Sequence, residues 1–175
     1  MTTTTIRALL PSDKRSLFRS GDIELDRFFQ QYAGQNQFKL WIGTSYVAVD
    51  GTGRILGYAT VTAGSIEIDR LPAKERKKLP SYPLPILRLA RLAVDESLKG
   101  QGLGSELLKY VLELAVKTAG SLGCIGVVVD AYPSATSYYE RFGFEAIELL
   151  EGESGMRPRT TAMFLSLATI KASMK

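Results

Sequence analysis

The sequence predicts a mixed α/β protein (α/β or α+β class) in which helices flank a single sheet. Strand-like and helix-like segments alternate along the 175 residues, and no repeat or linker-like tract divides them. Apolar residues make up 45% of the chain, and a chain of this length buries about 70% of its unfolded surface. We therefore expect one domain over residues 1–175, with the element order β-α-β-β-β-α-β-α-β-β.

The first half predicts a strand, a helix and a hairpin. Residues 4–9 are typical of a short strand, and residues 24–38 carry apolar side chains at helical spacing behind Asp22, a good N-cap. Residues 46–49 and 55–61 are strand-like and flank a glycine-bearing loop, which predicts two antiparallel strands. Residues 71–85 contain four prolines and a basic cluster, which predicts a loop with at most a short helix.

The second half predicts a buried strand, two helices and further strands. Residues 103–118 place apolar residues on one face of a helix, and residues 125–129 are almost all apolar and β-branched, as in a strand covered on both faces. The remaining expected elements are strands over 86–94, 144–149 and 161–167, and a helix over 134–141 that ends at Gly143.

The residues that are missing restrict the chemistry. The sequence contains no histidine, which excludes Ser-His-Asp and Cys-His catalysis and histidine-ligated zinc. Its single cysteine, Cys124, lies in an apolar stretch, so we expect it to pack in the core. No apolar run is long enough to span a membrane, and Met1–Thr5 lack the apolar core of a secretory signal, so we expect a cytoplasmic protein.

The net charge of +4 is moderately basic. This charge is compatible with binding of an anionic cofactor, with binding of a nucleic acid, or with a solvated surface that binds neither. The basic residues gather in three places: Lys14, Arg15 and Arg19; Lys74, Arg76, Lys77 and Lys78; Arg157 and Arg159.

A glycine-rich loop joins the strand at 86–94 to the helix at 103–118. Its sequence is Lys99-Gly100-Gln101-Gly102-Leu103-Gly104, followed by Ser105. Glycines permit positive φ, and the amides at a helix N-terminus bind anionic oxygens, so this loop predicts a site for a phosphorylated ligand. The spacing matches neither a Walker A loop nor a dinucleotide-binding fingerprint.

The surroundings of the loop resemble motif A of the GCN5-related N-acetyltransferase (GNAT) superfamily. The strand Arg91-Leu92-Ala93-Val94-Asp95 precedes the loop, Leu107-Leu108 follow it, and the later segment Ala135–Phe144 resembles the second signature of the superfamily. The resemblance implies the GNAT fold, with a mixed, mostly antiparallel sheet that has a V-shaped splay between its central strands. It also implies acetyl-CoA as co-substrate and no metal.

The resemblance also assigns roles to residues. It implies that the CoA pyrophosphate is held by Lys99, Gly100, Gln101, Gly102, Leu103, Gly104 and Ser105, although Lys99 replaces the usual Arg or Gln. The main chain of Leu92, Ala93 and Val94 would pair with the pantetheine arm like an added strand. Tyr139 matches the tyrosine that acts as general acid.

A closer resemblance extends over most of the chain. The segments Phe18–Phe29, Gly57–Thr60 and Leu79–Pro85 are similar to those of acetyltransferase toxins from bacterial toxin-antitoxin operons. That resemblance implies charged tRNA as substrate, a ribbon-helix-helix antitoxin as partner and a homodimer. Candidate contacts to the tRNA are Arg88, Arg91, Lys77 and Lys78.

Two other functions remain compatible with the sequence. The first is a GNAT enzyme that acetylates a small-molecule amine or a protein N-terminus. The second is a non-catalytic module that binds acyl-CoA. Without histidine, the chain lacks the usual general base, and this favours an aminoacyl-tRNA as acceptor. Its α-amino group titrates near about 8 and therefore needs little help from a base.

Overall fold

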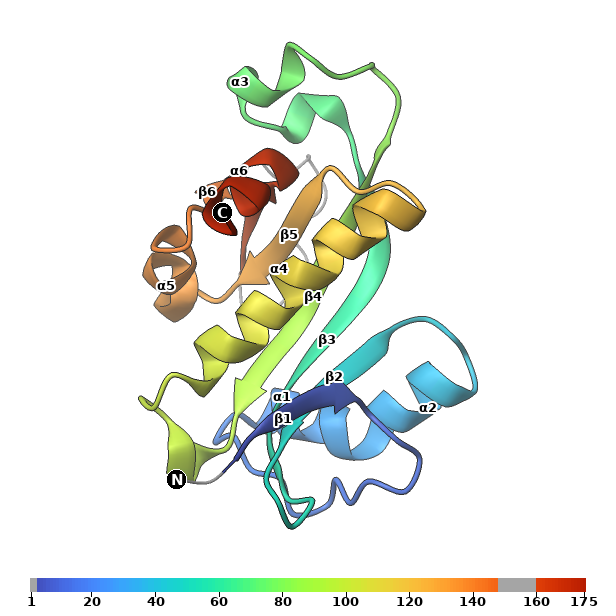
Figure 1. The fold of residues 1–175 in the computed structure, drawn as a ribbon, viewed down its shortest axis with the longest axis vertical. Coiled ribbons are helices and arrows are strands. Elements are labelled where there is room, and N and C mark those ends of the chain that lie inside the picture. The colour runs from blue at the N-terminus through green and yellow to red at the C-terminus, as the bar shows by residue number, and fades with distance from the viewer. Residues whose placement is uncertain (1–2, 148–159) are drawn as a thin grey trace. The chain divides into compact units, whose positions relative to one another are not determined.

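The computed structural model describes residues 3–147 and 160–175. Its strands form a seven-stranded sheet in the order β1-β2-β3-β4-β5-β7-β6 (Figure 1). The strands are β1 (Thr5–Ala8), β2 (Thr44–Val49), β3 (Ile55–Ile66), β4 (Leu84–Val94), β5 (Gly126–Ala131), β6 (Glu145–Ala146) and β7 (Thr161–Ser166). The α-helices are α1 (Ile23–Arg27), α2 (Ala33–Phe38), α3 (Ala73–Arg76), α4 (Leu103–Ser121), α5 (Thr136–Glu140) and α6 (Leu167–Ser173).

The predicted fold class is confirmed. The pairs β1–β2, β2–β3, β5–β7 and β6–β7 are all antiparallel, and helices accompany the sheet. The chain divides into two compact units: residues 1–62 with 89–111, and residues 63–88 with 112–175. Within the described residues, none of the helices combines the length and apolar character that a membrane span requires.

In the first unit, the predicted helix over 24–38 is present but is interrupted. Asp22 caps α1 by accepting a hydrogen bond from the Leu25 amide at 3.1 Å, as predicted. A π-helical turn, Phe28–Tyr32, then joins α1 to α2. The wider turn buries two consecutive residues, Phe28 and Phe29, which a regular amphipathic helix does less readily.

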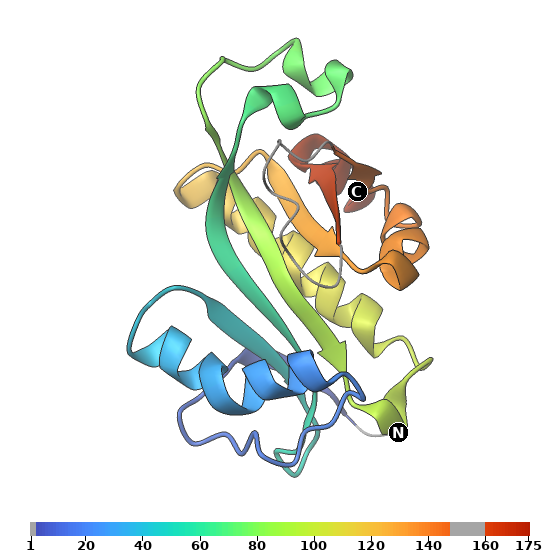
Figure 2. The ribbon, with the colours of Figure 1, turned by 180° about the vertical axis from the view of Figure 1, so that it is seen from behind.

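This helical segment packs on one face of the first unit's strands, and the first half of α4 lies on the other (Figures 1 and 2). The Phe29 ring stacks on Tyr58 of β3 at 4.3 Å, and Phe18 meets both rings edge-on. The Tyr58 hydroxyl donates to the Leu25 carbonyl at 2.7 Å. The buried aromatic cluster therefore fixes α1 and the π-helical turn against β3.

The second unit is built around β5 and β7. Val127, Val128 and Val129 are at most 3% exposed, which confirms a strand covered on both faces. A Cβ at Gly126 would lie 2.3 Å from the Leu165 carbonyl oxygen, so only glycine fits there. Cys124 is buried and donates to the Gly126 carbonyl, and burial raises the pKa of its thiol, in agreement with a packing role.

Two expected elements differ in extent, and one helix was not expected. The strand expected over 144–149 is only the two-residue β6, and its last two positions, like Arg157 and Arg159, lie outside the described residues. The helix expected over 134–141 is a 3-10 turn, Pro133–Ala135, followed by α5, with Gly143 at φ +98° after it. Helix α6 was not expected, because it is short and only Ile170 of its residues is buried.

Candidate active site

The strand that the sequence assigned to the pantetheine arm is the end of β4. Ala93 is buried, whereas Leu92 and Val94 are half-buried. A Cβ at Gly57 on β3 would lie 3.0 Å from both the Ala93 carbonyl oxygen and Leu107 Cδ1. Glycine at that position therefore lets α4 pack closely on the strands beside β4.

Asp95 fixes the turn that leads from β4 into the glycine loop. Its carboxylate accepts hydrogen bonds from the Ser97 amide at 3.0 Å and the Ser97 hydroxyl at 2.6 Å, and Arg54 lies 3.4 Å away. Burial acts to raise the pKa of Asp95, but the hydrogen bonds from Ser97, helped by Arg54, outweigh it and lower the pKa. The carboxylate is thus ionised at neutral pH and holds the start of the loop in place.

The glycine loop has the backbone that its composition predicted. Gly100 and Gly102 have φ of +82° and +86°, and a Cβ at either position would meet nothing within 4 Å. Helix α4 begins directly afterwards at Leu103, which is buried and anchors the loop. Glycine is therefore required here for backbone conformation rather than for close packing.

The helix start offers hydrogen-bond donors to an anion. The amides of Leu103, Gly104 and Ser105 lie in the first turn of α4, where an amide has no carbonyl four residues earlier in the helix. Lys99, Gly100, Gln101 and Gly102 are exposed beside them. These residues lie together in one loop, and such a donor set fits a pyrophosphate.

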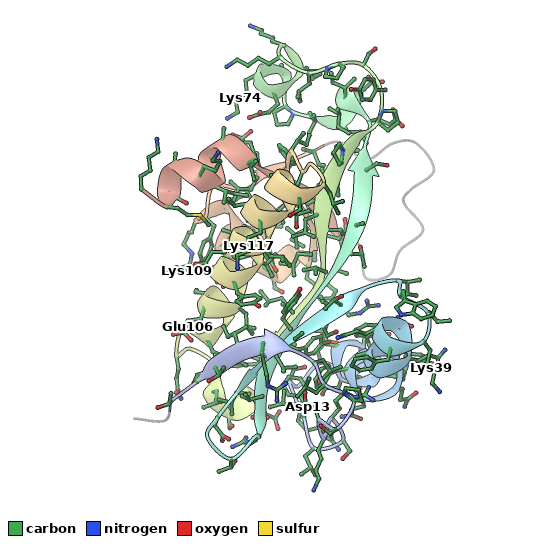
Figure 3. All side chains as sticks on the ribbon, turned by 45° about the vertical axis from the view of Figure 1, so that its right-hand side comes forward. Asp13, Lys39, Lys74, Glu106, Lys109 and Lys117 are labelled. Carbon is green, nitrogen blue, oxygen red and sulfur yellow. The ribbon has the colours of Figure 1, made fainter. Side chains whose placement is uncertain are left out.

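Lys99, the basic residue of the loop, ends near Glu96, which precedes the loop in the chain. A Cβ at Gly21 would lie 3.5 Å from both Glu96 Oε2 and Lys99 Nζ, so the two side chains end beside the same turn. Glu106 and Lys109 are exposed on the outer face of α4 and point away from the strands (Figure 3).

Tyr139, the candidate acid, lies on α5 in the second unit. It is 6% exposed, and its ring meets Phe144 and Tyr138 edge-on at 5.5 and 5.3 Å. Burial, with a smaller contribution from Tyr138, raises the pKa of Tyr139 well above that of a free phenol. Among the described residues, none forms a hydrogen bond with its hydroxyl, so the group carries a proton that no protein acceptor holds.

The four candidate tRNA contacts are not equivalent. Arg88 donates to Asp130 at 2.8 Å, so its charge is already paired. Lys77 and Lys78 follow α3 and are exposed. These three residues belong to the second unit, whereas Arg91 belongs to the first.

Arg91 lies in a pocket that the sequence did not predict. Its guanidinium stacks on the Phe28 ring, 3.7 Å from the centroid, at the edge of a pocket of about 190 Å³. The Ser45 and Thr60 hydroxyls share a hydrogen bond of 2.7 Å in its wall. The remaining lining residues are Ala33, Asn36, Ile42, Gly43 and Thr62. The sequence signal for this pocket is weak: it consists of the polar residues Ser45 and Thr60 within otherwise apolar strands. The two residues come together because β2 pairs with β3.

Comparison with known families identifies the chain. Residues 41–146 match the family described as acetyltransferase (GNAT) domain. The chain is 31% identical over 140 residues to a tRNA-acetylating toxin of Mycobacterium tuberculosis (strain ATCC 25618 / H37Rv), covering 79% of this chain and 82% of the relative. It is also 23% identical over 173 residues to a probable toxin TacT of Sinorhizobium fredii (strain NBRC 101917 / NGR234), covering 91% and 88%.

Solved structures agree with this match. AtaT complexed with acetyl-methionyl-tRNAfMet is 26% identical, with a TM-score of 0.87 over 99% of this chain and 100% of that one. AtaTR bound with acetyl-CoA is 28% identical, with a TM-score of 0.80 over 98% of each chain. A tyrosine-to-phenylalanine mutant of KacT is 27% identical, with a TM-score of 0.85 over 97% and 98%. The protein is therefore a member of the GNAT family, an acyltransferase that uses acetyl-CoA.

Proposed function

We propose that the protein transfers an acetyl group from acetyl-CoA to the α-amino group of an aminoacyl-tRNA, and thereby acts as a translation-blocking toxin. The observation that carries this proposal is the 31% identity to a tRNA-acetylating toxin across 79% of the chain. The similarity to AtaT, which was solved with acetyl-methionyl-tRNAfMet, supports the same acceptor.

Two segments of the first unit would hold the co-substrate. The amides of residues 100–105 and the Lys99 side chain would bind the pyrophosphate of CoA, because the loop has the required φ angles and unhindered glycines. The main chain of Leu92, Ala93 and Val94 would pair with the pantetheine arm, which calls for the expected splay beside β4. When bound, acetyl-CoA supplies an activated acetyl thioester.

Tyr139 would supply the proton that the departing thiolate takes up. Burial raises the pKa of its hydroxyl, so the phenol is protonated at neutral pH. A thiol titrates near about 8.5 and a phenol near about 10 or higher, so complete transfer to a free thiolate is uphill. Tyr139 would instead donate to the sulfur as the C–S bond breaks, and the proton that the acceptor nitrogen releases would replace the one that the phenol gives up.

The acceptor amine would need no strong base. An α-amino group titrates near about 8, and esterification of the neighbouring carboxyl lowers its pKa further, whereas a lysine side chain titrates near about 10.4. A chain without histidine suits the α-amine of an aminoacyl ester better than a lysine side chain.

The tRNA backbone would be bound by basic side chains. Lys77 and Lys78 are exposed and, among the described residues, have no acidic partner, so they are the best-suited phosphate contacts. Lys74 pairs with Glu145, and Arg88 pairs with Asp130. These two residues would have to exchange a carboxylate for a phosphate.

We extend the proposal to the assembly. The family match over residues 41–146 crosses both compact units, which supports a single functional domain. A cytoplasmic homodimer that is neutralised by a ribbon-helix-helix antitoxin fits a toxin of this kind. A neighbouring reading frame for such an antitoxin and light scattering of the purified protein would test these two points.

Radiolabelled acetyl-CoA separates the proposed acceptor from its alternatives. The protein is incubated with charged tRNA, uncharged tRNA, a panel of small amines and peptides with free N-termini. We expect label on charged tRNA that is released with the amino acid by mild alkali. Label confined to small amines or peptides would refute the tRNA acceptor and leave the acetyltransferase activity in place.

A further inference from the structure

The pocket around Arg91 combines a positive charge with three polar side chains for which the described residues supply no hydrogen-bond partner. Among the described residues, the side chains of Asn36, Thr62 and Arg91 take part in no hydrogen bond, although all three are half-buried. Unpaired donors and acceptors in a half-buried pocket favour a ligand that completes their hydrogen bonds.

The charge in this pocket is held by stacking, and no carboxylate of the described residues forms an ion pair with it. The Arg91 guanidinium lies 3.7 Å from the centroid of Phe28, the first residue of the π-helical turn. None of the pocket's lining residues is an aspartate or a glutamate. A positively charged group entering the pocket would meet the guanidinium with no carboxylate to offset the repulsion.

The opposite wall is also fixed. Gln37 accepts a hydrogen bond from the Ser45 amide at 2.8 Å and donates to the Leu9 carbonyl at 3.1 Å, which ties α2 to β2. The Ile42 amide donates to the Asn36 carbonyl at 3.0 Å, which holds the rim against α2. The pocket is therefore pre-formed, and it is smaller than the roughly 300 Å³ or more of sites for drug-sized ligands.

The location of the pocket links it to the reaction. Side chains alternate along a strand, so Arg91 shares a face of β4 with Ala93, which packs in the same apolar cluster as Phe28 and Phe29. Leu92, the residue between them, begins the segment assigned to the pantetheine arm. A group bound in the pocket would contact β4 at Arg91, directly before the segment that is assigned to the pantetheine arm.

We propose that this pocket receives the side chain of the acceptor's aminoacyl group, and that Arg91 determines its charge preference. Uncharged side chains with a polar or sulfur-containing end, and acidic ones, fit the unpaired donors. Lysine and arginine side chains are disfavoured by the guanidinium. This inference rests on the proposed aminoacyl acceptor, and it replaces a phosphate contact at Arg91 with a specificity role.

The test compares amino acids on a single tRNA body, so that only the side chain differs. One tRNA is charged in turn with methionine, glutamine and lysine, and kcat/KM for acetylation is measured. Wild type should prefer methionine and glutamine over lysine by about tenfold or more, the range typical of a pocket contact. Arg91→Gln should reduce that ratio to near one by raising the relative rate with lysine.

Two further variants separate charge from folding. Arg91→Lys keeps the positive charge and should keep the preference, even though it loses the planar stacking on Phe28. Arg27→Gln removes the same charge from an exposed position on α1 and should leave all ratios unchanged. Equal rates for lysine and methionine in wild type would overturn the proposal. So would an Arg91→Gln variant that loses the same factor on every amino acid, because that result indicates a shared phosphate or backbone contact.

Amino-acid methyl esters allow the pocket assignment to be tested independently of the proposed tRNA acceptor. The same panel is measured with methionine, glutamine and lysine methyl esters. If no charged tRNA is acetylated but the esters show the Arg91-dependent preference, the tRNA proposal fails and the pocket stands. If the esters also show no preference, the pocket assignment is wrong.

Discussion

Tyr138 and Tyr139 are neighbours on α5, yet their surroundings differ. Tyr139 is buried against Phe144, whereas Tyr138 is half-buried between Phe142 and the guanidinium of Arg141. Burial raises the pKa of Tyr139, which keeps its proton in place. At the scale of single residues, packing against Phe144 holds Tyr139 in place and burial keeps it protonated, and it is the tyrosine that the resemblance to the GNAT signature names as proton donor.

Replacing Tyr139 with phenylalanine tests this role. We expect Tyr139→Phe to lower kcat about a hundredfold, because general acid catalysis contributes about 10² to 10⁴. The KM for acetyl-CoA should hardly change. Tyr138→Phe removes a hydroxyl from the adjacent position and should retain nearly full kcat, as measured by steady-state acetylation of charged tRNA. Full activity of Tyr139→Phe would remove the acid role.

The raised pKa also predicts how the rate depends on pH. Since burial raises the pKa of Tyr139 above about 10, its proton is not lost between pH 7 and about 9.5. We expect kcat to rise with deprotonation of the acceptor amine and then to level off, without an alkaline fall. A decline in kcat below about pH 9 in wild type, absent from Tyr139→Phe, would show that Tyr139 ionises earlier than its burial allows.

At the scale of elements, the loop between β4 and α4 depends on backbone conformation. Gly100 and Gly102 take positive φ with open space around them. A side chain at either position would therefore act through backbone strain alone. Asp95 fixes the start of the loop, and Leu103 anchors its end, so strain inside the loop acts on the amides at the start of α4.

Gly102→Ala should weaken binding of the co-substrate. Positive φ costs a residue with a Cβ about 1–2 kcal/mol, which corresponds to about a 5- to 30-fold increase in the Kd for CoA. Calorimetry of CoA binding measures this effect. Gly120→Ala in α4 is the matched control, because its Cβ meets nothing within 4 Å and its φ is not positive; its Kd should equal that of wild type. Equal Kd values for both variants would contradict the assigned role of the loop.

At the scale of the whole molecule, basic side chains are exposed at several places. Lys77 and Lys78 follow α3, and Lys109 and Lys117 lie on α4, where Figure 3 labels them. A net charge of +4 alone would attract any polyanion. Only a position-dependent effect can distinguish a tRNA contact from general attraction.

The double variant Lys77→Gln/Lys78→Gln tests whether tRNA binding depends on the position of these two charges. We expect KM for charged tRNA to rise, and the dependence of log KM on log salt concentration to become shallower by about 0.7–0.9 for each lost phosphate contact. Lys109→Gln/Lys117→Gln removes the same charge from α4 and should change the slope little. Identical slopes for the two double variants would indicate general attraction rather than a tRNA contact at residues 77 and 78.

The local elements of the site were predictable from the sequence. Apolar periodicity located the helix after the glycine loop, and the glycines themselves indicated positive φ, because both properties depend on neighbours along the chain. The π-helical turn at Phe28 and helix α6 were not predicted. The first depends on aromatic packing against Tyr58, and the second buries too little of its surface to leave a pattern.

By itself, the sequence determined the fold class, because strand-like and helix-like segments alternate along the whole chain, and the positive φ angles of the glycine loop, because they depend on residue type. Its contiguous motifs named the loop as a candidate anion site and Tyr139 as a candidate acid. The tertiary structure decided which charges are already paired and which remain available. Arg88 meets Asp130 across strands, whereas Arg91 stacks on Phe28 beside Ser45 and Thr60. Those contacts join residues that lie 15 to 63 positions apart in the chain. The residues meet only because the strands pair and the helices pack, so no local sequence pattern predicts the contacts.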